Sequence, residues 1–260
     1  MVSIRGVHQS VRPSPVFLAI CAITAVGGVL AWLASDPQGV MAYVGVFVFV
    51  IAGWLVSLCL HEFAHAFLAW RYGDQDVAIR GYLTLNPLRY SSPALSIALP
   101  LIFIALGGIG LPGGAVYVRT GWMTPWRRTA VALAGAAVNA ALAVLLLVLT
   151  RLFADLTNVV FWSGMAFLGF LQVTAVVLNL LPIPGLDGYG ALEPHLSQET
   201  QRALEPAKQF GFFILLIVLI APPLNHWFFG IVYWFFDHSG VNPGLVAWGS
   251  HLTRFWSAFT

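Results

Sequence analysis

Charged side chains are scarce in this sequence. Of its 260 residues, 12 are lysine or arginine and 10 are aspartate or glutamate, so charged residues make up only 8% of the chain. A typical globular domain contains about 25%, and a soluble protein of this length could not cover its surface with so few. With 59% hydrophobic residues and a mean hydropathy of +0.85, the composition indicates a polytopic membrane protein.

Two further shortages exclude other classes of protein. The net charge is only +2, which is too small to neutralise phosphates, so no nucleic-acid partner is expected. The two cysteines, Cys21 and Cys59, both lie in apolar runs, which excludes a disulfide-stabilised secreted fold. The apolar composition likewise excludes an intrinsically disordered chain.

Six long stretches of the chain contain no charged residue. A helix needs about 20 apolar residues to cross a hydrocarbon core about 30 Å thick, and each stretch is long enough. The stretches are residues 13–35, 37–61, 90–118, 129–150, 156–186 and 209–236. They predict an all-α polytopic membrane protein with about five to six transmembrane helices. The lipid bilayer is therefore one of its expected partners.

The third stretch is not expected to form one continuous helix. Residues 90–118 contain three prolines and a cluster of glycines, and both residue types break helices. Short strands are predicted at 77–85 and 115–118, with turns at Asn86-Pro87 and Gly113-Gly114. We therefore expect a small membrane-associated β-hairpin or sheet and a re-entrant segment between the second and third core helices.

The sequence shows no internal repeat, polar linker or second soluble domain. We expect one integral-membrane domain over residues 1–260, with its core at 40–190 and accessory helices at 13–35 and 209–236. The first stretch could be a signal peptide, but its length and its poor cleavage-site residues favour a retained helix. The last stretch contains Pro222-Pro223, which could divide it into two shorter pieces.

A chemically distinctive group lies at the end of the second stretch, where residues 61–65 read His-Glu-Phe-Ala-His. Residues four apart share one face of a helix, so His61 and His65 can bind the same cation. Glu62 is near enough to accept a proton from water at that cation. This is the H-E-x-x-H arrangement of two zinc ligands and a general base. The alternative is that the histidines only satisfy carbonyl groups inside a helix bundle.

A catalytic zinc usually has three protein ligands and an open fourth position. The third candidate is Asp187, in the sequence Pro-Ile-Pro-Gly-Leu-Asp-Gly at 182–188. The prolines and glycines would unwind the backbone, and an unwound segment can turn a carboxylate into a bundle. An aspartate at a helix end is otherwise more often a cap, so its assignment depends on the histidine pair.

The positive charges give an independent indication of topology. If 90–118 enters and leaves on one face, Asp187 emerges on the same side as His65, and ten of the twelve basic residues lie on the cytoplasmic side. If all six stretches cross, the ligands are separated and the basic residues divide seven to five. The positive-inside rule favours the first arrangement, with the N-terminus and the opening of the site in the cytoplasm.

Two motifs in this chain together resemble the site-2 proteases, a family of intramembrane zinc metalloproteases. They are the H-E-x-x-H group and Asn179-x-x-Pro-x-Pro-x-x-Asp187-Gly, and the likeness runs roughly from Gly53 to Gly190. The segment from Gly73 to Pro87 also resembles that of the compact bacterial and archaeal members. No PDZ or CBS module is expected.

The resemblance implies one zinc ion per chain, held by His61, His65 and Asp187, with Glu62 as the general base. Asn139 matches a family element in which an asparagine positions the substrate or polarises its carbonyl. Ala136 stands where that element usually has proline, so the assignment of Asn139 as a catalytic residue rests on a partial match.

The implied function is zinc-dependent hydrolysis of a peptide bond within or near the transmembrane segment of a membrane-protein substrate, in regulated signalling. The implied location is a prokaryotic cell membrane, and the oligomeric state is not predicted. The alternative is an ion or proton transporter, because intramembrane ionisable groups also build ion pathways. Its relay would consist of His61, Glu62, His65 and Asp187.

Overall fold

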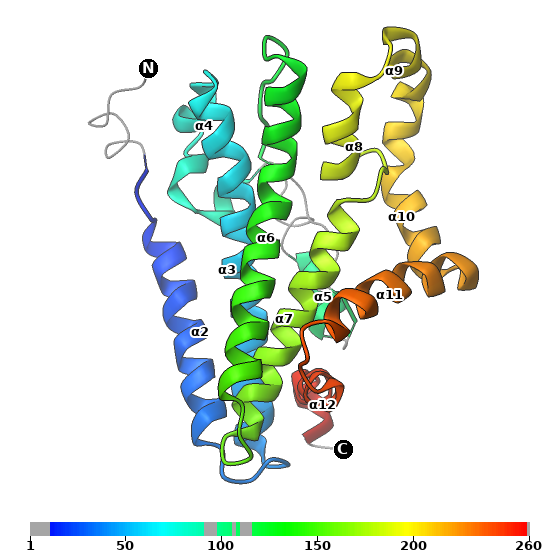
Figure 1. Cartoon of the computed structure of the whole chain (residues 1–260). Helices are drawn as coiled ribbons and strands as arrows, with labels where there is room; N and C mark the ends of the chain where they lie inside the picture. Colours follow the sequence, from blue (N-terminus) through cyan, green and yellow to red (C-terminus); the bar gives the residue numbers. More distant parts are fainter. Residues whose placement is uncertain (1–10, 91–97, 106–107, 110–115, 259–260) are drawn as a thin grey trace.

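The computed structural model describes residues 11–90, 98–105, 108–109 and 116–258. Four long helices form the body of the molecule (Figure 1), and they confirm four of the predicted apolar helices. They are α2 (Pro15–Leu33), α3 (Val40–Arg71), α6 (Pro125–Phe153) and α7 (Val159–Asn179). Nearly every residue of α7 is buried, so this helix lies at the centre of the bundle.

The four long helices form two antiparallel pairs, α2 with α3 and α6 with α7 (Figure 1). The C-terminus of α3, the N-terminus of α6 and the C-terminus of α7 therefore lie towards the same end of the bundle. In the first pair, α2 and α3 pack closely against each other at glycines. A Cβ at Gly45 of α3 would lie 2.6 Å from the backbone nitrogen of Ala31, and one at Gly27 of α2 would collide with the backbone of Phe49. Small residues of this kind let membrane helices approach backbone to backbone.

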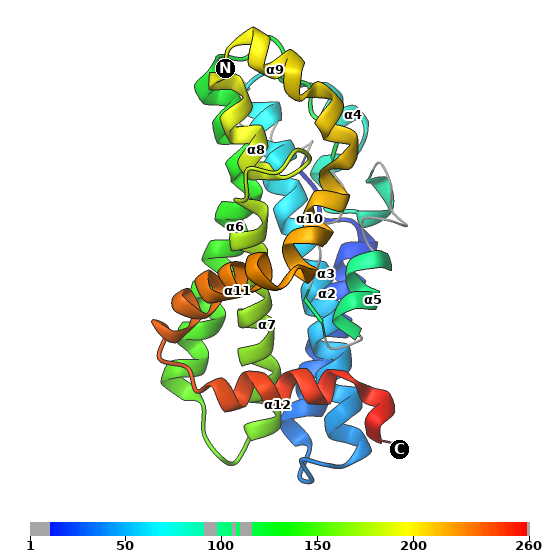
Figure 2. The same ribbon diagram turned by 90° about the vertical axis from the view of Figure 1, so that its right-hand side faces the viewer.

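The remaining elements are shorter. They are α4 (Asp76–Ile79), η1 (Tyr82–Thr84), η2 (Pro87–Arg89), α5 (Leu99–Ala105), α8 (Asp187–Leu192), η4 (Glu193–His195), α9 (Gln198–Leu204), η5 (Glu205–Phe210), α10 (Gly211–Ile220), α11 (Pro222–Asp237), α12 (Pro243–Thr253) and η6 (Phe255–Ala258). Figure 2 shows α11 and α12 running across the long helices rather than along them.

The predicted strand at 77–85 is wrong, because this segment forms α4 and η1. The Asp74 carboxylate accepts the N–H of Asp76 at 3.1 Å at the start of the first turn. Val77 and Leu83 are buried, whereas Ile79 is 83% exposed, so the apolar residues do not alternate as a strand requires. The segment instead packs against the end of α3.

The predicted second strand and its turn are only partly described. Val116–Val118 has no regular secondary structure, and Ala115 and Gly113-Gly114 lie outside the described residues. The part of the chain that the structure describes contains no strand, so the β-hairpin is not found there. The turn at Asn86-Pro87 is confirmed, because the Asn86 side chain accepts the N–H of Leu88 at 3.0 Å.

As the sequence predicted, residues 90–118 do not form one continuous helix. α5 has only seven residues, a length of about 10 Å at 1.5 Å per residue, which is too short to cross a bilayer. Gly108, Ile109 and residues 116–120 are not helical. Most of the rest of this stretch lies outside the described residues.

The last apolar stretch is divided, because α10 ends at Ile220 and α11 begins at Pro222. The ring of Pro222 occupies the first turn of the new helix, where its missing N–H costs nothing. The fifth helical stretch long and apolar enough to cross a membrane is therefore Gln198–Ile220, which combines α9, η5 and α10. Within the described residues the chain has five such stretches, which makes it a multi-pass membrane protein.

Candidate metal centre

His61, His65 and Asp187 meet at one point inside the bundle. The two histidines lie one turn apart on α3 and are 8% and 9% exposed, and Asp187 is the first residue of α8. The Nε2 atoms of the histidines are 3.1 Å apart. Each lies 3.4 Å from one carboxylate oxygen of Asp187.

These distances fit a tetrahedral zinc site. Ligand atoms about 2.1 Å from a tetrahedral zinc ion are about 3.4 Å from one another. The two Nε2 atoms are 3.1 Å apart, and each lies 3.4 Å from a different oxygen of Asp187. Asp187 Oδ2 is buried and has no hydrogen-bond donor. Two imidazoles and a carboxylate are ligands that zinc prefers. Among the described residues, this is the single group of three or more histidine, cysteine or acidic side chains with such a spacing.

The other ring nitrogen of each histidine is occupied by a protein oxygen. His65 Nδ1 donates to the backbone carbonyl of Val131 at 2.7 Å, and His61 Nδ1 contacts Asn139 Oδ1. Because a carbonyl can only accept, the proton of neutral His65 is on Nδ1 and its Nε2 carries a lone pair. Hydrogen bonds of this kind orient histidines that bind metals. Two Nε2 lone pairs and a carboxylate facing one another require a cation or a proton between them.

Gly135 of α6 lies directly against the histidine pair. A Cβ at this position would be 2.5 Å from both Cε1 and Nε2 of His61, and closer still to His65 Nε2. The absence of a side chain at Gly135 is therefore what leaves room for both rings.

The backbone between α7 and α8 is unwound and aims Asp187 into the bundle. α7 ends at Asn179, and Gly185 in the connection adopts φ 96°, a left-handed conformation that favours glycine. Gly188 lies so close to Leu180 that a Cβ there would collide with that residue's carbonyl oxygen. The prediction that prolines and glycines would break the helix before Asp187 is confirmed.

Glu62 lines the same cavity as these three side chains and is only 3% exposed. Its Oε2 atom accepts the backbone N–H of Val116 at 2.8 Å. The segment 116–120, to which Val116 belongs, is held at its other end by Asp74, whose buried carboxylate accepts the N–H of Arg119 at 2.6 Å. Two carboxylates thus hold this irregular segment over the site.

A cavity of about 560 Å³ opens at the site. Its polar lining includes His61, Glu62, His65, Asp187, Thr120, Asn179, Arg128, Glu193 and Lys208. Alternate residues of the 116–120 segment, Val116, Val118 and Thr120, face into it. Lys208 forms ion pairs of 2.7 Å with Glu193 and Glu205 at the same opening.

Asn139 does not line this cavity. It is 4% exposed, its Oδ1 atom contacts His61 Nδ1, and its Nδ2 atom donates to Gln172 Oε1 at 2.7 Å. The structure therefore places it behind the histidine, on the side away from the cavity.

Sequence reasoning missed several residues around the site. Val131 contributes a backbone carbonyl and Val116 a backbone N–H, which no side-chain pattern can reveal. Gln172 could have been noticed, since it is an amide in the middle of the charge-free stretch 156–186.

Comparison with known proteins identifies the family. Two proteins that carry the name "Putative zinc metalloprotease Rip2" are similar over nearly their full length. The protein from Mycolicibacterium smegmatis is 67% identical over 258 residues, which are 99% of this chain and all of the relative. The protein from Mycobacterium tuberculosis is 68% identical over 97% of each chain. YwhC of Bacillus subtilis, named in the same way, is 30% identical over 65% of this chain and 78% of its own.

The chain belongs to the site-2 protease family. This membership makes it an enzyme, a zinc metalloendopeptidase. The group formed by His61, His65 and Asp187 is one that could hold the metal ion. No protein-family model and no solved structure matches the chain.

Proposed function

We propose that this protein is an intramembrane protease that binds one zinc ion and cleaves a transmembrane protein substrate. The observation that carries the proposal is the position of the ligands within α3. His61 lies ten residues before the end of α3 at Arg71, which is about 15 Å along the axis at 1.5 Å per residue. His65 lies six residues, or about 9 Å, before the same end, so the reacting groups would lie within the membrane and be reached from the face at which α3 ends.

Within this proposal, His61, His65 and Asp187 would hold the zinc, and the cavity beside them would admit water and substrate. A bound zinc ion supplies a Lewis acid that polarises a carbonyl and acidifies water. The Glu62 carboxylate takes a proton from the attacking water and delivers it to the leaving amide nitrogen. The N–H of Val116 holds one oxygen of Glu62, which leaves the other free to face the cavity.

We place the N-terminus and the opening of the site in the cytoplasm of a prokaryotic cell. Among the described basic residues, all but Arg151 and Arg254 belong to elements or loops at the metal-site end of the bundle. Such an excess of positive charge is typical of the cytoplasmic side. The charged opening, with Arg128, Glu193 and Lys208, would let water reach the site. The stretch 90–118 would re-enter the membrane without crossing it.

The segment 116–120 is suited to hold an unwound substrate. A helix hides its peptide bonds in internal hydrogen bonds, so a transmembrane substrate must unwind before cleavage. Val116, Val118 and Thr120 face the cavity, whereas Tyr117 is 57% exposed. This alternation would let a substrate pair along the backbone as an added strand. Val118→Pro should reduce cleavage, and unchanged cleavage would exclude this mode of binding.

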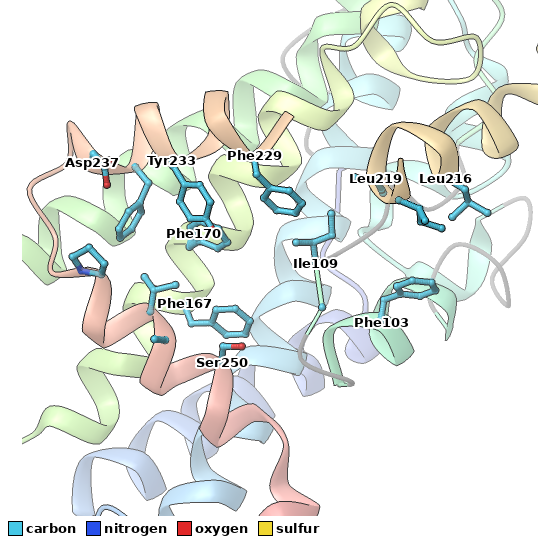
Figure 3. Close-up of a pocket in the computed structure, with 16 residues that line it drawn as sticks. Phe103, Ile109, Phe167, Phe170, Leu216, Leu219, Phe229, Tyr233, Asp237 and Ser250 are labelled. Atoms are coloured by element: carbon cyan, nitrogen blue, oxygen red, sulfur yellow. The ribbon is translucent and has the colours of Figure 1, made fainter. Parts of the chain in front are cut away.

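The helical part of the substrate would contact a second, apolar cavity of about 650 Å³ (Figure 3). Phe103, Phe170, Leu216 and Phe229 point into it from four helices. α10 connects the two cavities, since Leu215 borders the metal site and Leu216 borders the apolar cavity. Leu216→Trp should therefore slow cleavage of a transmembrane substrate more than cleavage of a short peptide. An equal effect on both would contradict this contact.

Cleavage of such a segment would free its soluble part from the membrane, which suits a role in regulated signalling. The test of the function is purification of the parent protein and Glu62→Gln in detergent, with zinc content and cleavage of a transmembrane substrate measured on both. We expect one zinc ion per chain in each protein, and cleavage in the parent alone. Loss of at least about 100-fold is expected from removal of a general base. Absence of stoichiometric zinc, together with Glu62-dependent ion flux in vesicles that contain the protein, would favour a transporter instead.

A further inference from the structure

A continuous chain of buried polar side chains begins behind the metal site. His61 on α3 contacts Asn139 on α6, and Asn139 donates to Gln172 on α7 at 2.7 Å. Gln172 Nε2 donates to the hydroxyl of Ser57 at 2.8 Å, and that hydroxyl contacts the backbone carbonyls of Gly53 and Trp54 at 3.0 Å. The chain thus joins three helices and returns to α3 one turn before His61.

All three side chains behind His61 are withdrawn from solvent and from the cavity. Gln172 is 0% exposed, Ser57 3% and Asn139 4%, and none of them lines the cavity at the metal site. A polar group buried without partners costs several kcal/mol in a membrane interior, so each amide depends on its neighbour in the chain.

The donor and acceptor roles along this series of side chains are fixed at Ser57, the end away from His61. The carbonyls of Gly53 and Trp54 can only accept, so the Ser57 hydroxyl donates to them and its oxygen accepts from the Gln172 amide. The Gln172 carbonyl must then accept from the Asn139 amide, which turns the Asn139 carbonyl oxygen towards His61. His61 consequently donates from Nδ1 and presents the lone pair of Nε2 to Asp187 and His65.

A reversed chain would have the opposite effect on the metal site. If the Asn139 amide faced His61, it would donate to Nδ1, and the proton of the neutral imidazole would move to Nε2. A protonated Nε2 cannot bind a metal ion. The orientation of the Asn139 amide, which Gln172 on α7 fixes, therefore decides whether His61 is available as a ligand.

We propose that Ser57, Gln172 and Asn139 are positioning residues that hold His61 in the tautomer able to bind zinc. This inference rests on the proposed zinc-dependent function and adds residues that the two sequence motifs do not contain. It differs from a purely structural role, in which the same hydrogen bonds would only join α3, α6 and α7.

The test compares Gln172→Met, Gln172→Glu and a control on the same helix, Thr174→Val. Methionine fills the space of Gln172 but can neither donate nor accept, so Asn139 loses its orientation. A protonated glutamic acid offers one acceptor and one donor as the amide does. Thr174 is equally buried, but its hydroxyl bonds only to the carbonyl of Phe170 in its own helix.

The measurements are zinc affinity in detergent by competition with a chelator, the visible spectrum of the cobalt-substituted protein, and thermal unfolding of the metal-free protein. Loss of a partner that orients a ligating histidine typically weakens binding by about 10- to 100-fold. We expect this loss, with an altered cobalt spectrum, in Gln172→Met. Gln172→Glu should recover most of the affinity, and Thr174→Val should match the parent even if it unfolds at a lower temperature.

The inference fails if Gln172→Met binds zinc as tightly as the parent, or if Thr174→Val weakens binding to the same degree. A parent protein that binds no zinc would overturn the proposed function together with this inference. A parent that binds zinc alongside unaffected variants would overturn the inference alone.

Discussion

Gly135 and His65 lie so close that no side chain can stand between them. A Cβ at position 135 would collide with His65 Nε2 and would lie 2.5 Å from the ring of His61. On its opposite side, the His65 ring bonds to the Val131 carbonyl and the His61 ring contacts Asn139. Neither ring can move away from position 135 without breaking these contacts.

We therefore expect Gly135→Ala to displace the histidines and to reduce zinc affinity by at least tenfold, although no ligand is replaced. The same substitution at Gly230 of α11, where a Cβ would meet nothing within 4 Å, is the matched control. Chelator competition on both variants tests this. Equal zinc affinity in the two variants would show that the rings have room to move.

Gly188 sets the position of Asp187 from the other side. A Cβ at Gly188 would lie 2.6 Å from the carbonyl oxygen of Leu181 and closer to that of Leu180. Gly188→Ala should therefore shift the start of α8 and weaken zinc binding. Gly190→Ala on the same helix meets only the Ala132 methyl group at 3.4 Å and should bind zinc as the parent does. The two dissociation constants are compared, and a ratio near one would contradict the prediction.

Asp74 is expected to matter for cleavage but not for zinc. Its buried carboxylate holds the N–H groups of Asp76 and Arg119, and hydrogen bonds to a charged group contribute about 1.5–3 kcal/mol each. Asp74→Ala should release the 116–120 segment, which lowers the rate of substrate cleavage while zinc content stays at one per chain. Cleavage at the parental rate would mean that the segment does not act on the substrate.

Asp76→Ala is the control for that experiment. Its ion pair with Arg119 is 2.8 Å long but partly exposed, and such pairs contribute about 0–1 kcal/mol. We expect the stability and the cleavage rate of this variant to remain close to those of the parent.

Removal of zinc should destabilise the fold. A ligand present at 1,000 times its dissociation constant stabilises the folded state by about 4 kcal/mol, and this contribution is lost on chelation. The unfolding midpoint of the parent should therefore fall when a chelator is added, and that of Asp187→Ala should respond much less. Identical midpoints of the parent with and without chelator would contradict a zinc ion bound at this site.

The sequence alone indicated the membrane class, the four long helices and the three side chains, His61, His65 and Asp187, that the structure brings together. Scarcity of charge is a property of composition, and the spacing of His61 and His65 fixes their common face on any helix. The motif around Asp187 contains its own helix breakers, so even its unwound backbone could be predicted.

Only the tertiary structure decided how these parts are arranged. Residues 77–85 carry strand-forming residues, but burial of Val77 and Leu83 against the end of α3 made the segment helical. The role of Asn139 towards the substrate stays a prediction from the family resemblance, and only the structure shows that this side chain lies between His61 and Gln172. Hydrogen bonds between distant helices, like the collision that only glycine avoids at position 135, depend on three-dimensional distances. Local sequence patterns do not contain that information.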